Sequence, residues 1–166
     1  MKSFSKVPKK SIDISSNGFA EKSTDVITGY RLLFSKKSFL IDDVISDFHW
    51  TNIYDNPNYL TVQIGENQHI ELLPTHLECA NHSCDPNAFF DITIKQLVCI
   101  KPIKEGEEIT FFYPSAEWDM DRPFDCSCKS LFCVGRIEGA KYLTKEQLTR
   151  YRFTDFIQQK LAEDKR

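Results

Sequence analysis

The segment of residues 81–87, Asn-His-Ser-Cys-Asp-Pro-Asn, constrains the fold of this chain more than any other stretch. Asparagine, serine and aspartate bond readily to nearby backbone groups, and proline fixes its own φ, so this composition predicts a turn. Apolar runs that suit β-strands lie on both sides of it, at residues 68–73 and 88–94. The simplest interpretation is a polar loop between two strands. Two features further along the chain indicate that this loop belongs to a functional site.

The first of these features is residues 106–113, Gly-Glu-Glu-Ile-Thr-Phe-Phe-Tyr, which predict a turn leading into a strand that ends in a tyrosine. The second is the spacing Cys126-x-Cys128-x4-Cys133, which is typical of a metal-binding segment. In this order the three motifs resemble those of the SET-domain family of lysine methyltransferases, and the cysteines are similar to its post-SET zinc segment. The resemblance covers roughly residues 18–140.

Length and composition limit the alternatives. A chain of 166 residues, 41% of them apolar, is long enough for one domain with a buried core. A net charge of −3 does not favour direct binding to nucleic acid. The sequence has no apolar run that could cross a membrane and no pattern of a secretory signal, so we predict an intracellular protein, cytoplasmic or nuclear. Its six cysteines are then thiols or metal ligands, and Cys79 and Cys99, among apolar neighbours, are predicted core residues.

The distribution of β-forming residues predicts a mostly β fold. Two hairpins are expected, one turning at residues 65–67 and the other at Lys95, whereas the polar stretch 42–58 predicts turns. The resemblance implies the β-clip arrangement of SET domains, in which small curved sheets surround a pseudoknot. The expected strands are residues 30–34, 39–41, 59–64, 68–73, 88–94, 96–101 and 108–113.

Four segments are expected along the chain. Residues 1–17, rich in lysine and serine, predict a flexible N-terminal arm. By the resemblance, residues 18–124 form the SET domain and residues 125–143 the post-SET zinc segment. Residues 144–166 are predicted to be a C-terminal helix. It begins with the form of a capping box, Thr144-Lys145-Glu146-Gln147, and its apolar residues recur at helical spacing: Phe153, Phe156, Ile157 and Leu161.

The post-SET cysteines supply three of the four ligands that a structural zinc site needs, and no cysteine or histidine follows Cys133. The resemblance implies that the fourth ligand comes from the first motif and that the ion ties the two segments together. The expected ligands of Zn2+ are Cys84, Cys126, Cys128 and Cys133. The alternative is that the three later cysteines are unrelated thiols in a loop.

The resemblance also implies a reaction, in which S-adenosyl-L-methionine gives its methyl group to the ε-amine of a protein lysine. The amine must be neutral to attack, and a free lysine has a pKa of about 10.4. A narrow apolar channel and the cationic cofactor both favour the neutral form. Tyr113 matches the family's catalytic tyrosine, which orients the amine and contacts the cofactor; the alternative is a tyrosine that ends a core strand. A histone, a histone-like protein and a ribosomal protein all fit as substrate.

The remaining cofactor contacts are expected at Asn81, His82 and Gly29. Asn81 and His82 match family positions that contact S-adenosylmethionine, and Gly29 matches the first residue of a Gly-x-Gly turn beside it. The second glycine is replaced by Arg31 or Leu32. This departure leads to a second hypothesis, a non-catalytic SET module that acts as a protein-interaction domain. Titration with S-adenosylmethionine distinguishes the two hypotheses.

Phe111 precedes Tyr113 by two residues, so on a strand both side chains point to the same face. In the SET family, a tyrosine at this position holds a water that fills the space a methylated amine needs. A phenylalanine leaves that space free, so Phe111 predicts dimethyl- or trimethyl-lysine as the product. The alternative is that Phe111 is a core residue without influence on the product. Tyr59, at the start of an expected strand, is a further candidate for lining the lysine channel.

Overall fold

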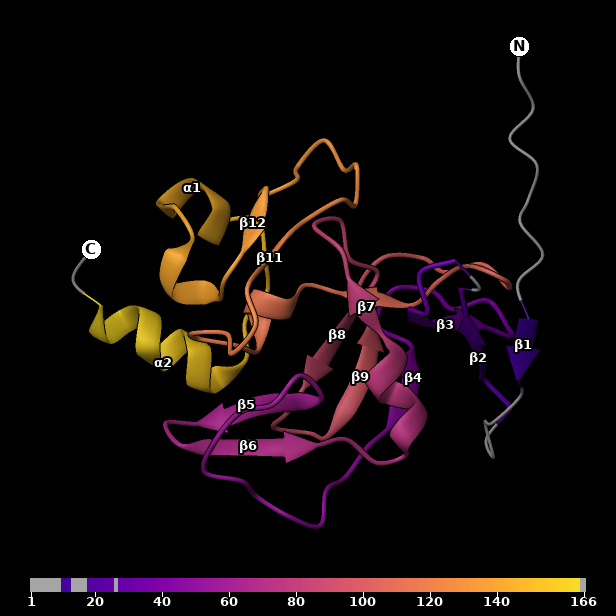
Figure 1. Ribbon diagram of the computed structural model, residues 1–166, viewed down its shortest axis with the longest axis horizontal. Coiled ribbons are helices and arrows are strands. Elements are labelled where there is room, and N and C mark those ends of the chain that lie inside the picture. The colour runs from indigo at the N-terminus through magenta and orange to yellow at the C-terminus, as the bar shows by residue number, and fades with distance from the viewer. Residues whose placement is uncertain (1–9, 13–17, 26, 165–166) are drawn as a thin grey trace.

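A computed structural model describes residues 10–12, 18–25 and 27–164, and of residues 10–12 only the backbone. Short strands dominate this part of the chain and form five small sheets (Figure 1). The mostly β fold expected from the sequence is therefore confirmed.

The strands are β1 (Lys10–Ile12), β2 (Ala20–Thr24), β3 (Arg31–Ser35), β4 (Val44–Asp47), β5 (Thr61–Gly65), β6 (Gln68–Glu71), β7 (Asn81–His82), β8 (Ala88–Asp91), β9 (Gln96–Cys99), β10 (Thr110–Phe111), β11 (Phe124–Asp125) and β12 (Arg136–Ile137). The helices are the 3-10 turns η1 (Thr75–Cys79), η2 (Tyr113–Ser115) and η3 (Ala140–Tyr142) and the α-helices α1 (Lys145–Leu148) and α2 (Asp155–Glu163).

The first sheet, β1–β2–β3, is antiparallel. β1 lies within the segment predicted to be a flexible arm, whereas the structure pairs its residues with β2. The remaining residues of that arm, 1–9 and 13–17, lie outside the described residues. Gly29 is in the turn between β2 and β3, where its φ of 74° is one that glycine adopts without strain. The N–H of Gly29 closes this turn on the carbonyl of Asp25, at 2.8 Å.

Both hairpins expected from the sequence are confirmed. β5 pairs with β6, and β8 pairs with β9, each in antiparallel register. β4 adds to the second hairpin and gives the sheet β4–β9–β8. The sequence of residues 42–58 predicted only turns, whereas the structure places the strand β4 there. Pairing with β9 lets β4 bury Ile45.

The expected strand at residues 39–41 is wrong. Phe39 makes a single bridge to Ile103, while Leu40 is in a turn and exposed. The N–H of Leu40 donates to the carboxylate of Asp43 at 2.7 Å, and the N–H of Asp43 donates back to the carbonyl of Leu40 at 3.1 Å. These local bonds satisfy the backbone in a turn, so the β-forming side chains do not decide its conformation.

Two clusters of buried side chains stabilise the fold. The larger one lies among the sheets and includes Leu33, Ile70 and Leu97, together with Cys79 and Cys99. The sequence prediction that these two cysteines are core residues is therefore confirmed. The smaller cluster joins residues 137–143 to the C-terminal helices, and its buried members are Cys84, Phe112, Ile137, Ala140, Leu143, Phe153 and Ile157. Tyr113 packs against both clusters and so lies where they meet.

A short parallel ladder joins two of the sequence motifs, residues 81–87 and residues 106–113. β7 pairs with β10, with Asn81 facing Thr110 and His82 facing Phe111. The side chain of Asn87 supports this pairing, because its amide nitrogen donates to the carbonyl of Glu108 at 2.8 Å and its oxygen accepts from the N–H of Thr110 at 2.9 Å. The pairing brings residues 81–87 beside the strand that leads to the expected catalytic tyrosine.

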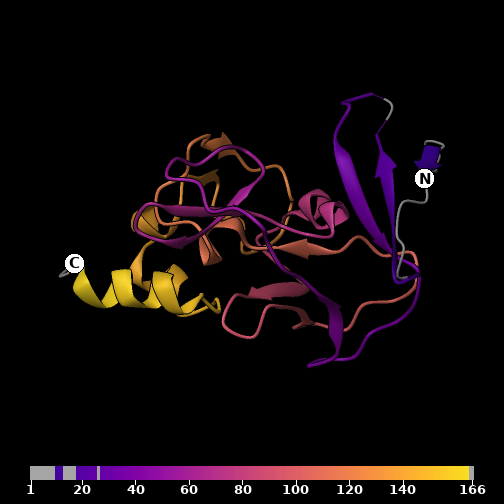
Figure 2. The ribbon, with the colours of Figure 1, turned by 90° about the horizontal axis from the view of Figure 1, so that it is seen from below.

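The C-terminal segment contains two helices where the sequence predicted one. The capping box is confirmed, since Thr144 and Gln147 each accept a hydrogen bond from the other's backbone N–H. That helix, α1, ends after one turn, and α2 begins only at Asp155. Figures 1 and 2 show α2 at the opposite end of the molecule from the β1–β3 sheet. Within the described residues, no helix has both the length and the apolar character needed to cross a membrane.

Candidate functional site

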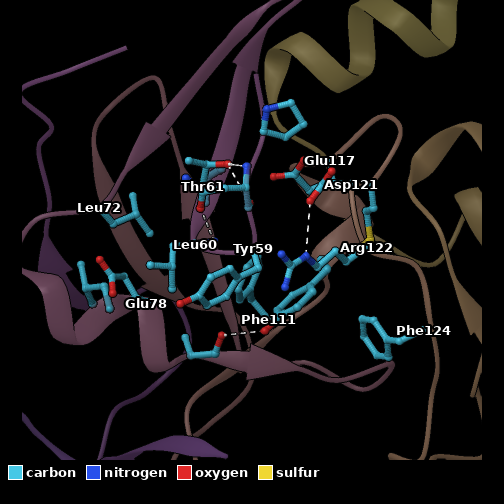
Figure 3. Close-up of a pocket in the computed structure, with 17 residues that line it drawn as sticks. Tyr59, Leu60, Thr61, Leu72, Glu78, Phe111, Glu117, Asp121, Arg122 and Phe124 are labelled. Atoms are coloured by element: carbon cyan, nitrogen blue, oxygen red, sulfur yellow. Dashed lines mark hydrogen bonds and ion pairs between the residues drawn. The ribbon is translucent and has the colours of Figure 1, made fainter. Parts of the chain in front are cut away.

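A cavity of about 220 Å³ opens between β5, η1 and the segment that runs from β10 to β11 (Figure 3). Aromatic rings and carboxylates share its wall. The aromatic residues are Tyr59, Phe111, Tyr113 and Phe124, and the charged residues are Glu78, Glu117, Asp121 and Arg122. A concave site with apolar walls and a few polar groups is the common form of a small-ligand site. Tyr59, which the sequence made a candidate for lining the lysine channel, lies in this wall.

Phe111 and Tyr113 lie together in the cavity wall, with ring centroids 4.8 Å apart. Tyr113 is the first residue of η2 and not part of a strand, so the strand alternation assumed from the sequence does not apply. The expected outcome, two side chains at one site, still holds. The hydroxyl of Tyr113 donates to the carbonyl of Ala80 at 3.4 Å. Burial raises the pKa of Tyr113 to about 12, so the phenol keeps its proton at neutral pH.

Phe112, between these two residues, faces a different environment. Its ring is buried in the smaller cluster and stacks on Tyr151, with centroids 3.6 Å apart and planes 8° apart. It lines a second cavity, of about 470 Å³, together with Cys84 and Arg150. Phe111 and Tyr113 therefore line the first cavity, whereas Phe112, between them, lines the second.

His82 connects Cys84 to Tyr113. Its Nδ1 accepts the backbone N–H of Tyr113 at 3.2 Å, and its Nε2 lies 3.2 Å from the sulfur of Cys84. Because a backbone N–H can only donate, Nδ1 carries no proton, and Nε2 is the nitrogen that donates to the sulfur. Burial lowers the pKa of His82 to about 4, so the ring is neutral at physiological pH.

The structure brings all four expected metal ligands together. The sulfur atoms of Cys84, Cys126, Cys128 and Cys133 lie within 4.8 Å of one another. Those of Cys84 and Cys126 are 3.8 Å apart. Tetrahedral zinc with bonds of about 2.3 Å requires sulfur atoms about 3.8 Å apart, so this donor set fits zinc.

Hydrogen bonds to the sulfur atoms support the same interpretation. The backbone N–H of Val134 points to the sulfur of Cys84, and that of Cys128 points to the sulfur of Cys126, both at 3.4 Å. Thiolates, which are the form of cysteine that binds metal, accept such bonds well. The cluster could therefore hold a metal ion, whereas unrelated thiols in a loop would not converge in this way.

The three other residues expected at a cofactor site lie on neighbouring elements. The amide nitrogen of Asn81 donates to the carbonyl of Arg31 at 2.7 Å and contacts the carboxylate of Glu108 at 3.1 Å. Arg31, one of the two residues considered for the missing glycine, thus holds Asn81 through its backbone. Gly29 is exposed, and a Cβ there would meet no atom within 4 Å, so its backbone is open to a ligand. Within the described residues, neither cavity is lined by Gly29, Asn81 or His82.

Glu117 also lies in the wall of the cavity, although no sequence motif marked it as a site residue. It is partly buried, and its carboxylate accepts the backbone N–H of Gln63 at 3.0 Å. Gln63 also accepts the backbone N–H of Trp118 at 3.0 Å, which fixes the segment that carries Glu117. Burial raises the pKa of Glu117 to about 8. The sequence offered one signal, an acidic residue between the apolar Ala116 and Trp118.

Comparison with known proteins gives two results. The family model described as SET domain matches residues 9–114. A protein named Methyltransferase flvH, from Aspergillus flavus, is 40% identical over 106 residues, which are 63% of this chain and 59% of that protein. The chain therefore spans about three fifths of the length of this relative. The family match includes residues 81–87, Phe111 and Tyr113, and it ends before the three later cysteines.

The raised pKa of Glu117 predicts a pH-dependent stability. Between pH 4.5, the ordinary pKa of a glutamate, and about 8, the folded protein holds a proton that the unfolded chain has lost. The free energy of unfolding therefore falls as the pH rises through this range, by up to about 1.4 kcal/mol per pH unit for one proton. Glu117→Gln removes this proton but keeps an acceptor for Gln63, so its unfolding free energy should fall less steeply.

Urea unfolding of both proteins from pH 4.5 to 9 measures the effect, and the difference between them removes contributions that both share. Glu66→Gln, which removes an exposed carboxylate, should keep the wild-type slope. Equal slopes for the wild type and Glu117→Gln would contradict the prediction.

Proposed function

This chain belongs to the SET-domain family of methyltransferases, and on that premise we propose that it methylates the ε-amine of a lysine in a protein substrate. The observation that carries the proposal is the pair of rings of Phe111 and Tyr113 in the wall of one cavity. An aromatic channel fits the aliphatic part of a lysine, and its low polarity lowers the pKa of the amine toward the neutral, reactive form. The identity of the substrate protein and an intracellular location stay predictions.

In this proposal Tyr113 orients the amine. Its hydroxyl keeps its proton at neutral pH because burial raises its pKa to about 12, so it can donate a hydrogen bond as well as accept one. The backbone of Tyr113 is held by His82 and its hydroxyl by Ala80. A group fixed at both ends is well suited to holding a nucleophile in a reactive geometry, which is a large part of the rate enhancement of such enzymes.

The expected methyl donor is S-adenosylmethionine, which when bound supplies an electrophilic methyl group on a positively charged sulfur. Asn81, His82 and Gly29, together with Tyr113, would hold it. The hydrogen bond from Asn81 to Arg31 supports the order of this region, because it ties β7 to the strand that follows Gly29. The open backbone of Gly29 is compatible with a ligand lying against it.

The metal in the cysteine cluster is proposed to be zinc, with a structural role. Four cysteine ligands complete a tetrahedral site and leave no position for substrate. An ion there would fix the post-SET segment against residues 81–87. It would also hold Cys84 and therefore the ring of His82, which supports Tyr113.

The reaction is tested by incubating the purified protein with isotopically labelled S-adenosylmethionine and a cell lysate, followed by mass spectrometry of the labelled peptides. Label on lysine that depends on the protein supports the proposal. If S-adenosylmethionine does not bind at millimolar concentration in a calorimetric titration, the methyltransferase proposal fails and the non-catalytic interaction module takes its place.

Tyr113→Phe removes one hydroxyl group and should reduce turnover about a hundredfold or more, the usual effect of losing one positioned catalytic group. The ring still fills its place between the two clusters, so the fold and the affinity for S-adenosylmethionine should change little. Initial rates with the labelled donor, together with calorimetric affinity, measure both effects. Wild-type turnover in this variant would mean that another residue orients the amine.

Phe111→Tyr should shift the product toward monomethyl-lysine. Phe111 lines the cavity beside Tyr113, so the added hydroxyl would be placed to hold a water in the space that a methylated amine needs. Mass spectrometry after long incubation with excess donor should show dimethyl- or trimethyl-lysine for the wild type and mainly monomethyl-lysine for the variant. A wild type that stops at one methyl group would contradict the role proposed for Phe111.

Cys128→Ser should lower the zinc content of the protein and its activity, while most of the β sheets stay folded, because the cluster lies outside the larger core. Cys99→Ser is the matched control, since Cys99 lies outside the cluster and a serine can keep its hydrogen bond to the carbonyl of Lys101. Elemental analysis should find one zinc per chain in the wild type and in this control. Freshly purified, unchelated wild type without zinc would disprove the assignment.

A further inference from the structure

Glu117 is a carboxyl group in the cavity wall that has no cationic partner within the described residues. Burial raises its pKa to about 8, so it is protonated in the empty cavity at neutral pH and would be ionised by a bound cation. Its carboxylate accepts one backbone N–H, from Gln63, and lies in the wall of the cavity. Within the part of the chain that the structure describes, no lysine, arginine or histidine side chain forms an ion pair with it. A carboxyl group that is removed from water without a cationic partner and lies in the wall of a cavity is a candidate for binding a ligand.

The other charges of the cavity differ in this respect. Glu78 faces Arg31, with 3.8 Å between the nearest atoms, and Asp121 faces Arg122 at 3.6 Å. Arg122 also lies over the ring of Tyr59, 5.2 Å from its centroid. Figure 3 shows Glu117 and Asp121 on one side of the cavity and Glu78 on the other. The wall thus has three carboxyl groups against one guanidinium, and the carboxyl group without a guanidinium partner is that of Glu117.

This charge balance determines which ligands fit. An anionic ligand would be repelled by the carboxylates of Glu78 and Asp121 and would oppose ionisation of Glu117. A metal ion needs converging ligands, and among the described residues the cysteine cluster, not the acidic residues of this cavity, meets that condition. An organic cation satisfies both the carboxylate and the aromatic wall, because ring faces attract cations.

We propose that Glu117 is the residue that binds the substrate as a primary alkylammonium ion, the group that ends a lysine side chain. This inference rests on the proposed function, which it deepens by naming the form in which the substrate enters. Glu117 follows Tyr113 by four residues, and both line the same cavity. The ammonium group is captured at one wall of the site in which it reacts.

The same residue can prepare the amine for attack. When the ammonium gives one proton to the carboxylate of Glu117, a neutral amine and a neutral carboxyl replace the ion pair, and no other bond changes. Burial raises the pKa of Glu117 to about 8, closer to that of an amine than an ordinary carboxyl, so this transfer is less unfavourable. The other groups that face the cavity are the charged Glu78, Asp121 and Arg122 and the phenols of Tyr59 and Tyr113.

The test uses the full chain, labelled with nitrogen-15, and two small probes of equal size. n-Butylammonium chloride represents the end of a lysine, and 1-butanol represents the same chain without charge. The backbone N–H of Gln63 donates to Glu117, so its NMR signal reports directly on that carboxylate. Butylammonium should shift this signal in a saturable manner, and butanol at the same concentration should not.

Two variants complete the test. Glu117→Gln should weaken butylammonium binding at least about tenfold, and Glu66→Gln, which removes a carboxylate outside the cavity, should bind like the wild type. Equal shifts with both probes, or equal affinity in the two variants, would overturn the inference. The comparison of probes needs only the wild type, so it holds even if Glu117→Gln folds poorly.

The outcome is separable from that of the methyl transfer assay. Butylammonium binding that depends on Glu117, in a protein that transfers no methyl group, would leave this inference standing and reject the proposed function. Methyl transfer to lysine together with an unchanged KM in Glu117→Gln would reject this inference and leave the proposed function standing.

Discussion

The parallel ladder between β7 and β10 is the contact on which the rest of the site depends. It has two residue pairs, Asn81 with Thr110 and His82 with Phe111. Two strands this short have little stability of their own, and the side chain of Asn87 adds two hydrogen bonds to the backbone of β10 and its neighbour. Cys84 and Tyr113 are then placed relative to this ladder. Cys84 follows β7, and Tyr113 follows β10.

His82 shows how closely the two halves are joined. One ring nitrogen accepts the backbone N–H of Tyr113, and the other donates to the sulfur of Cys84. A single neutral imidazole therefore contacts a residue of the cavity wall and a residue of the cysteine cluster. The ring is also surrounded by the aromatic side chains of Phe112, Tyr113 and Phe124. This packing leaves the imidazole one orientation in which both of its hydrogen bonds can form.

The sequence predicted those features that depend on local chemistry. Turn residues located both hairpins, and the capping box at Thr144 gave the start of α1 correctly. The four cysteines could be assigned to one metal site only through the family resemblance, because Cys84 is 42 residues from Cys126. Their convergence is a property of the fold.

The errors have a common physical origin. Leu40 and Ile41 have β-forming side chains, yet hydrogen bonds between Leu40 and Asp43 hold them in a turn. β4 forms in a polar stretch because β9 is available to pair with it. Glu117 was missed because its importance comes from burial and from Gln63, which lies 54 residues away. Local pattern does not report such long-range partners.

The stacking of Phe112 on Tyr151 has a consequence for how this protein can change over time. The two rings are nearly parallel, and the hydroxyl of Tyr151 also donates to the carbonyl of Cys84 at 3.0 Å. A larger or smaller side chain at either position would leave an overlap or a gap beside the motif at residues 81–87. The two positions are therefore expected to co-vary among relatives. Natural selection would act on them as one unit, although one belongs to the centre of the domain and the other to its C-terminal end.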